Sequence, residues 1–511
     1  MNRILAALAL ALTVLVAPSP AHAAPPSANT GRSGWTPRPE IYPATVTRTD
    51  LAIPMSDGVV LRGDLVLPAG ADGRAVRGRF PVIVTITAYN KTARSSGGGL
   101  AGAPPAYLVK RGYAQLTVDA RGTGSSEGEW SAFGARENKD SAEVVAWAHS
   151  RKRPWSDGRV GMSGPSYMGI NQILAAARHP AGLKAIFRQV PAGDVYRDVV
   201  ASGGQIDVGF IPLWMGLVTG AGTVPPAVTQ SDPQSGFGAL LSHLFAAGSF
   251  TVPLLLDATL GGDAAYDGPF YRERSPIEVV DRVEVPTFLV SGEYDLFQRG
   301  TPLLFESLRA RGVPTRLVVG PWDHLQASSG EGLEDAGYGG LPCFSDNAAN
   351  DRTGVVFETA PLTDPLRLQG PINARLYTSS LSGDGMLSVS VSDVAPDGTV
   401  ARLSGGWQVI SQRALDRSRT RHLDGRVIQP YHPFTRASKQ PLASGQVAPV
   451  DVEVFPTAAR IAPGHRLRIA IQAFDVPHLL PTAPDLPGTL TVLTLHSSER
   501  YPSELRIPGV G

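Results

Sequence analysis

A serine, an aspartate and a histidine occur in this chain at positions where together they could perform acyl transfer. Ser166 lies in Gly164-Pro165-Ser166-Tyr167-Met168-Gly169, after a short apolar run and before the Ala-rich segment 170–177. A tight strand-to-helix turn would hold its hydroxyl above a sheet edge, near the positive end of a helix. The motif departs from Gly-x-Ser-x-Gly, because Met168 stands at position +2 and the glycine follows one residue later. Taken alone, the motif is also compatible with an ordinary glycine-rich turn.

A serine hydroxyl is a weak nucleophile at neutral pH, so it needs a base and a group that orients the base. Asp295 follows the apolar run 287–292, and His324 follows the run 315–319. The carboxyl ends of parallel strands meet at one edge of a sheet, and the chain order Ser, Asp, His is that of α/β-hydrolases. We expect His324 to accept the Ser166 proton during attack on a carbonyl carbon and Asp295 to orient the imidazole, before water releases the acyl-enzyme.

Each of these residues also has a simpler interpretation. Asp295 alone could be a surface turn residue, and His324 is one of ten histidines. Asp323 could replace Asp295, although a residue adjacent to His324 is expected to point away from its ring. The placement of all three after successive predicted strands favours the triad.

The apolar patterns predict the elements that would position these residues. Partial alternation in 59–67 indicates an antiparallel opening to a sheet, whereas the β-branched runs 81–86 and 113–118 are typical of buried parallel strands. A helical pattern over 137–149 leads to the strand before Ser166. Strands alternating with helices predict an α/β fold with a mainly parallel sheet covered on both faces.

Two further regions differ from this pattern. Residues 195–275 carry many large apolar residues among glycines and prolines without strand alternation, which predicts an inserted helical cap. Beyond the catalytic domain, which we place at 46–350, residues alternate at period two in 387–392, 466–471 and 490–495. The segment 351–511 is therefore predicted to be an antiparallel β-sandwich.

Composition limits the partners of this protein. The 511 residues are 42% apolar and 18% charged with a net charge of +1 and no dense basic tract, which favours small neutral substrates over nucleic acid. No spacing such as His-Glu-x-x-His is present, and we expect neither a metal nor a cofactor. Cys343 is the only cysteine, so no intramolecular disulfide forms, and a buried or idle thiol is expected there. The oligomeric state is not indicated.

The N-terminus has the pattern of an export signal. Arg3 precedes an apolar core from Ile4 to Val16. Ala21-His22-Ala23 then has small residues at the positions that a signal peptidase recognises. We expect a signal peptide at 1–24, a linker rich in Pro, Ser and Gly at 25–45, and a secreted protein without a membrane anchor. An uncleaved anchor is the alternative, but the apolar core is shorter than the ~20 residues that a membrane span needs.

These motifs resemble the cocaine-esterase and X-prolyl dipeptidyl-peptidase family of serine hydrolases. The family's Gly-x-Ser-Tyr-x-Gly turn is similar to residues 164–169, including the displaced final glycine, and its Asp-x-Arg-Gly-x-Gly-x-Ser-x-Gly loop is similar to residues 119–128. The resemblance covers nearly the whole mature chain. It implies an α/β-hydrolase fold with an inserted cap, followed by a jelly-roll C-terminal domain.

The resemblance also implies an oxyanion hole. In the family, a tyrosine hydroxyl and the backbone N–H of the residue after the nucleophile play this role, and here those residues are Tyr89 and Tyr167. The family often has proline before this tyrosine, whereas this chain has Ala88. The alternative for Tyr89 is that its ring simply packs under the loop.

The same resemblance bears on the substrate, which we expect to be a small ester or a short peptide. A family branch that binds α-amino groups has carboxylates two and three residues after the triad aspartate, where this chain has Phe297 and Gln298. Phe297 is similar to the aromatic residue that lines the acyl pocket of the cocaine-esterase branch. With Trp214 and Phe210 from the cap, it predicts an apolar acyl pocket, although both cap residues could equally be cap core.

Two other functions stay open. Asp207 or Glu293 could supply a carboxylate for a substrate amine, which would suit an X-prolyl dipeptidyl-peptidase that releases N-terminal Xaa-Pro dipeptides. A secreted binding protein with a relic hydrolase domain is the alternative of another class.

Overall fold

The computed structural model describes residues 36–92, 105–224, 226–329, 347–476 and 478–507. The predicted signal peptide, most of the predicted linker and Cys343 lie outside these residues. Residues 40–511 form one compact unit, and its first strand begins at Ala44.

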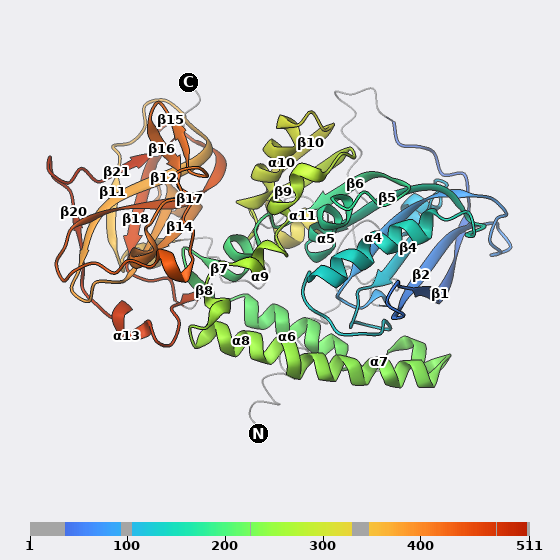
Figure 1. The fold of residues 1–511 in the computed structure, drawn as a ribbon. Helices are drawn as coiled ribbons and strands as arrows, with labels where there is room; N and C mark the ends of the chain where they lie inside the picture. The colour runs from blue at the N-terminus through green and yellow to red at the C-terminus, as the bar shows by residue number, and fades with distance from the viewer. Residues whose placement is uncertain (1–35, 93–104, 225, 330–346, 477, 508–511) are drawn as a thin grey trace. The chain divides into compact units, whose positions relative to one another are not determined.

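The first half of this unit is built on an eight-stranded sheet in the order β1-β2-β4-β3-β5-β6-β9-β10 (Figure 1). Pairing is antiparallel between β1, β2 and β4 and parallel from β4 to β10, which confirms the predicted antiparallel opening and parallel centre. The strands are β1 (Ala44–Pro54), β2 (Val60–Ala69), β3 (Phe80–Thr87), β4 (Ala114–Asp119), β5 (Ser156–Pro165), β6 (Leu183–Gln189), β9 (Thr287–Tyr294) and β10 (Thr315–Asp323).

Helices connect these strands and bury the sheet. β4 is buried along its whole length, as expected for a central strand covered on both faces. The predicted helix over 137–149 is α4, and it packs with α5 beside β5. The helices of this domain are α3 (Pro105–Val109), α4 (Ala135–His149), α5 (Tyr167–Ala176), α10 (Gly300–Ala310), α11 (His324–Ser329) and α12 (Ala348–Asp351).

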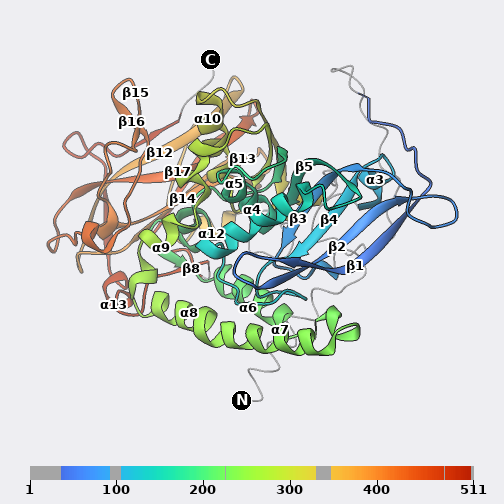
Figure 2. The ribbon, with the colours of Figure 1, turned by 45° about the vertical axis from the view of Figure 1, so that its right-hand side comes forward.

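A mainly helical insertion separates β6 from β9, in the region where the sequence predicts a cap. Figures 1 and 2 both show α6 lying alongside the end-to-end helices α7 and α8. Its elements are η1 (Val195–Val200), β7 (Ala201–Ser202), β8 (Gln205–Asp207), α6 (Ile211–Gly222), η2 (Ala227–Gln230), α7 (Pro233–Ala246), η3 (Ala247–Thr251), α8 (Val252–Thr259), η4 (Asp263–Ala265), α9 (Pro269–Arg272), η5 (Pro276–Glu278) and η6 (Val280–Arg282).

The C-terminal part is an all-β domain, as predicted, whose main sheet runs β11-β18-β13-β14-β17-β12-β20 with antiparallel pairing throughout. Alternate residues of β17 (Val450, Val452 and Val454) are fully buried and mark its core face. Of the alternating runs in the sequence, 387–392 is buried on both faces, whereas Leu490 and Val492 are exposed. A jelly-roll connection of these strands stays a prediction. The other strands are β11 (Val355–Glu358), β12 (Leu366–Ser380), β13 (Met386–Val394), β14 (Val400–Val409), β15 (Arg421–Leu423), β16 (Arg426–Gln429), β17 (Ala448–Ile461), β18 (Arg466–Gln472), β19 (Leu479–Leu480), β20 (Leu493–His496) and β21 (Glu504–Arg506), with η7 (Ile410–Gln412), η8 (Arg436–Ser438) and α13 (Leu486–Thr489).

Buried polar contacts join the all-β domain to the hydrolase domain and the cap. β19 pairs with β8 of the cap. The buried guanidinium of Arg299 bonds Asp198 at 3.2 Å and Glu453 of β17 at 3.0 Å. Because breaking one side of a buried ion pair is costly, these contacts hold the domains in one arrangement.

Candidate active site

Ser166 lies at the sharp turn between β5 and α5. Its backbone has φ 54° and ψ −125°, a strained conformation for a non-glycine residue that is characteristic of a nucleophile turn. The two glycines of the motif are required by space: a Cβ on Gly164 would lie 2.6 Å from Met168 Cβ, and one on Gly169 would lie 2.8 Å from the carbonyl oxygen of Gln189. The displaced glycine therefore lets α5 approach the end of β6.

Asp295 and His324 lie at the same sheet edge as Ser166. Asp295 follows β9, and His324 is the first residue of α11 after β10, so both side chains start from the carboxyl ends of neighbouring parallel strands. His324 Nε2 lies 2.9 Å from Ser166 Oγ, and His324 Nδ1 lies 2.6 Å from Asp295 Oδ1. Through these contacts a proton can pass from the Ser166 hydroxyl to the His324 ring, and the Asp295 carboxylate orients that ring.

Asp323, the alternative partner of His324, has a different role. Its carboxylate accepts hydrogen bonds from the backbone N–H groups of Leu325 and Gln326 at 2.9 and 2.8 Å. Asp323 therefore caps the first turn of α11 and helps to place His324.

Tyr89, from the loop after β3, also lies next to Ser166. Its hydroxyl accepts a hydrogen bond from the indole N–H of Trp214 at 3.0 Å. Burial raises the pKa of Tyr89, and hydrogen bonds with Trp214, Ser166 and the backbone N–H of Tyr167 act in the opposite direction. The hydroxyl thus lies among the groups expected around a developing oxyanion.

The side chain of Tyr167 is held by a buried carboxyl group. Its hydroxyl donates a hydrogen bond to Glu137 of α4, and its ring stacks on Phe133 at a centroid distance of 4.5 Å. Burial raises the pKa of Glu137 to about 7, although hydrogen bonds from Tyr167 and from the backbone of Phe133 and Ser131 oppose this shift. Glu137 therefore fixes the side chain of the residue that follows Ser166.

The aromatic residues predicted to line the acyl pocket form one row beside His324. Phe297 packs edge-on against the His324 ring at 5.0 Å and against Phe210 at 6.2 Å, and Phe210 stacks on Trp214 at 6.4 Å. Phe297 is 2% exposed. These contacts place an apolar wall next to the imidazole.

A cavity of about 180 Å³ beside His324 is less apolar than the sequence predicts. Phe210 lines it, whereas Phe297, Trp214 and Ser166 do not, so an acyl pocket lined by all three aromatic residues stays a prediction. Phe297 is screened by its packing on His324 and Phe210, and Trp214 is turned toward Tyr89. The cavity wall also carries charged residues from the cap, from the ends of β9 and β10 and from the all-β domain: Asp207, Glu293, Asp323, Arg402, Asp475 and His478.

The two carboxylates considered for binding an amine are already engaged. Asp207 lies 3.2 Å from His478 Nε2, and Glu293 accepts hydrogen bonds from the Thr457 hydroxyl and the Ala458 N–H. Burial lowers the pKa of His478, but its hydrogen bonds to Asp207 and Asp475 outweigh this effect and raise the pKa to about 9. No feature of the sequence pointed to His478, which lies far along the chain from its cap partner.

The 119–128 loop helps to hold the segment that carries Tyr89. Asp119 accepts the backbone N–H groups of Lys91 and Ser125 at 2.6 and 2.8 Å. The Lys91 ammonium is completely buried and lies 2.6 Å from Asp50 and 3.1 Å from Asp64. Because Lys91 follows Tyr89 by two residues, this buried ionic cluster anchors the loop that carries Tyr89. Within the part of the chain that the structure describes, no group of His, Cys, Asp and Glu has the arrangement of a metal site.

The fold and this serine turn define the class: the protein is a serine hydrolase with an α/β-hydrolase domain. The model of the X-Pro dipeptidyl-peptidase (S15) family matches residues 57–326, and that of the X-Pro dipeptidyl-peptidase C-terminal non-catalytic domain matches residues 293–506. The chain belongs to the S15 family.

Relatives with known names agree with this assignment. The chain is 24% identical to a Mycobacterium bovis protein named as a serine esterase, over 89% of this chain and 94% of that protein. It is 23% identical to the cocaine esterase of a Rhodococcus species, over 84% of this chain and 91% of that protein. The structure of a CocE/NonD family hydrolase from Staphylococcus aureus superposes with a TM-score of 0.68 at 19% identity, covering 91% of this chain and 94% of that one.

Proposed function

We propose that this protein is an exported carboxylesterase that uses Ser166, His324 and Asp295 and forms a covalent acyl-enzyme. The observation that carries the proposal is the contact chain from Ser166 Oγ through the His324 ring to Asp295 Oδ1. His324 takes the serine proton as Oγ attacks the ester carbonyl and returns it to the leaving alcohol. Water, deprotonated by His324, then releases the acyl group.

The oxyanion of each tetrahedral intermediate is bound in this proposal by the Tyr89 hydroxyl and the Tyr167 N–H. Support comes from the interactions of the Tyr89 hydroxyl with Ser166 and with the Tyr167 backbone, so that both proposed donors lie next to the nucleophile. Donors aimed at the developing charge contribute about 10²–10³ each to the rate.

An ester with an aromatic or branched acyl group is the substrate class that we propose. The row formed by Phe297, Phe210 and Trp214 offers apolar contacts next to His324. The relatives aligned over most of their length are named as esterases, which supports the same choice. The family model, in contrast, is described by X-Pro dipeptidyl-peptidase activity, so this peptidase activity is the second candidate.

Amine recognition is the feature that separates the two candidates. A peptidase of this kind must bind a free N-terminal ammonium, and Asp207 and Glu293 line the cavity beside His324. His478 is shared between Asp207 and Asp475, and Glu293 accepts hydrogen bonds from Thr457 and Ala458. Both carboxylates therefore already have partners in the protein, which favours the esterase.

A direct comparison of two chromogenic substrates tests the choice. We expect p-nitrophenyl benzoate to be hydrolysed with a much higher kcat/KM than an Ala-Pro p-nitroanilide, and a Ser166→Ala variant to hydrolyse neither. Rapid anilide cleavage with little esterase activity would instead assign the peptidase function. Failure to process either substrate, together with no labelling by a fluorophosphonate, would favour a binding protein with a relic hydrolase domain.

Export is proposed from the N-terminal pattern of Arg3, the apolar core 4–16 and Ala21-His22-Ala23. The mature protein recovered from culture medium is expected to begin near residue 25. An intact Met1 in cell-associated protein would contradict export.

A further inference from the structure

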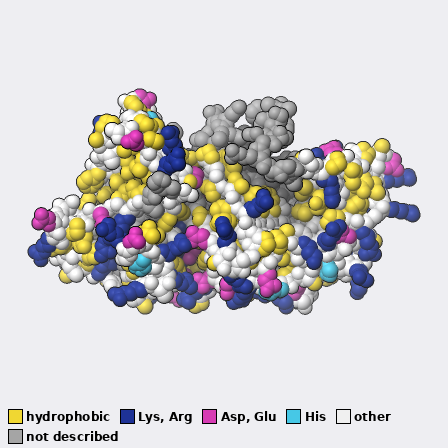
Figure 3. Space-filling model, turned by 90° about the horizontal axis from the view of Figure 1, so that it is seen from above, with side chains coloured by type: hydrophobic (Ala, Val, Ile, Leu, Met, Phe, Trp, Pro, Cys, Tyr) yellow, Lys and Arg dark blue, Asp and Glu magenta, His cyan; other side chains and the backbone are white. Residues whose placement is uncertain are grey.

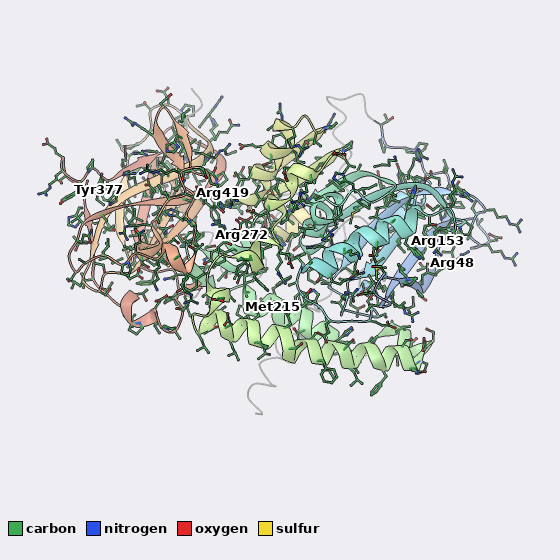
Figure 4. The ribbon with its side chains drawn as sticks, in the orientation of Figure 1. Arg48, Arg153, Met215, Arg272, Tyr377 and Arg419 are labelled. Atoms are coloured by element: carbon green, nitrogen blue, oxygen red, sulfur yellow. The ribbon has the colours of Figure 1, made fainter. Side chains whose placement is uncertain are left out.

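The long cap helix exposes a row of large apolar side chains on its outer side. α7, η3 and α8 run end to end from Pro233 to Thr259 (Figure 1), and the side chains on one side project away from the rest of the molecule (Figure 4). The buried positions hold mostly small residues: Gly236, Ala239, His243, Ala246, Thr251 and Ala258. The exposed positions, here called the outer face, hold Phe237, Leu241, Leu244, Phe245, Val252, Leu256 and Leu260.

An ordinary surface helix has its apolar stripe on the core side alone. This helix packs Phe250, Leu254 and Leu255 against the core and exposes large apolar residues on its other side as well. Phe245 is 68% exposed and Phe237 61% exposed. Contiguous apolar surface of this kind marks a site where another molecule binds.

Charge excludes several classes of partner. Between Arg197 and Arg272 the sequence contains no Lys, Arg or Glu, whereas Lys, Arg, Asp and Glu are interspersed over the surface seen in Figure 3. Without basic residues the outer face cannot attract nucleic acid or an anionic membrane. Its partner must be apolar and uncharged.

The helix is fixed to the body of the enzyme, although it is long and apolar enough to be a candidate membrane span. His243 is buried, and its ring nitrogens lie 3.0 Å from the carbonyl oxygen of Gly222 and 2.9 Å from that of Ser126. Ser126 belongs to the loop that follows β4 of the central sheet. Crossing a bilayer would break these contacts, so the outer face must be covered while the helix stays in place.

The spacing of the outer face is self-complementary. Its large residues lie in pairs at equal distances on either side of the Gly248–Ser249 peptide bond: Phe237 with Leu260, Leu241 with Leu256, and Phe245 with Val252. A two-fold axis requires one patch to contact its own copy, which an antiparallel helix pair with such symmetric spacing satisfies. Gly248 and Ser249 are exposed and small, so two helix axes could approach to about 8 Å where they cross.

We propose that the outer face is the contact between two copies of this chain, whose α7–α8 helices cross antiparallel about a two-fold axis at Gly248–Ser249. Each copy covers the large apolar side chains of the other. The dimer forms through the caps and leaves Ser166 of each copy in its own active site.

Cysteine cross-linking tests the register of this contact. In a Cys343→Ser background, Ser249→Cys places two thiols next to the axis, and mild oxidation is expected to give a covalent dimer in high yield. Phe237→Cys is the matched control on the same helix, because its two copies would lie about 35 Å apart at about 1.5 Å of rise per residue. We expect it to give little cross-linked product.

Sedimentation of the mature protein at micromolar concentration provides the second measurement. We expect a dimer for the wild type and a monomer for Phe245→Glu, which would bury a carboxylate against Val252 of the second copy, with unchanged far-UV circular dichroism and esterase activity. A monomeric wild type, or equal cross-linking of the two cysteine variants, would overturn the proposal. Monomers that bind vesicles of zwitterionic lipid would also overturn it and assign the outer face to a lipid surface.

Discussion

The indole N–H of Trp214 donates a hydrogen bond of 3.0 Å to the hydroxyl of Tyr89. Trp214 belongs to α6 of the cap, whereas Tyr89 belongs to the loop after β3, so this bond joins the cap to the proposed oxyanion hole. The bond restrains the direction in which the Tyr89 hydroxyl presents its own proton. Movement of α6 would therefore change the catalytic geometry as well as the pocket.

Replacement of Trp214 by Phe tests this connection. We expect kcat to fall about 2- to 10-fold, since a neutral hydrogen bond contributes about 0.5–1.5 kcal/mol. In a Tyr89→Phe background the same replacement should have no further effect on kcat, because the acceptor is already absent. Additive losses in the double variant would show that Trp214 acts only through packing.

Tyr89→Phe is expected to lower kcat about 10²–10³-fold with a small change in KM, because the lost donor acts mainly in the transition state. Tyr107→Phe is a suitable control, since Tyr107 is exposed on α3. Steady-state kinetics with p-nitrophenyl benzoate provide both parameters. A rise in KM at unchanged kcat would instead assign Tyr89 to substrate packing.

The meeting of Ser166, Asp295 and His324 could be expected from the sequence because each follows a parallel strand, and the carboxyl ends of such strands lie at one sheet edge. The bond between Trp214 and Tyr89 could not be predicted, because the orientation of α6 depends on packing against Trp130 and Phe133 from a distant segment. His478 and Asp207 are separated by 271 positions along the chain, so no local pattern could pair them.

The polar character of the cavity beside His324 has the same origin. Its charged residues come from the cap, from the ends of strands and from the all-β domain. These regions lie far apart in the sequence, and no local pattern links them. Only the assembled domains bring them together, so the sequence pointed to Asp207, Glu293 and Asp323 singly and missed Arg402, Asp475 and His478.

Glu137 predicts a dependence of stability on pH. Because its folded pKa, about 7, lies above the ordinary value of 4.5, the neutral carboxyl stabilises the folded state fully below pH 4.5, and this contribution is lost as pH rises through 7. The change is on the order of 3 kcal/mol. The Tm of Glu137→Gln, measured from pH 4.5 to 8, should decline less than that of the wild type. Parallel curves would show that Glu137 does not titrate in this range.

His478 predicts a second pH dependence. Its folded pKa, about 9, is raised above the ordinary 6.5, so its bonds to Asp207 and Asp475 stabilise the protein fully below pH 6.5 and weaken as pH rises through 9. The Tm deficit of His478→Gln should be largest at pH 6 and should shrink toward pH 10. A deficit that is constant with pH would indicate lost packing rather than lost charge.

The nucleophile itself can be tested most directly by trapping the acyl-enzyme. The wild type treated with p-nitrophenyl benzoate or a fluorophosphonate and digested is expected to carry the acyl or phosphonyl mass on the peptide that contains Ser166. Ser166→Ala should carry none, and His324→Gln should react far more slowly at the same residue. Modification of a different residue, or equal labelling of the Ser166→Ala variant, would contradict the assignment of Ser166, His324 and Asp295 as the catalytic groups.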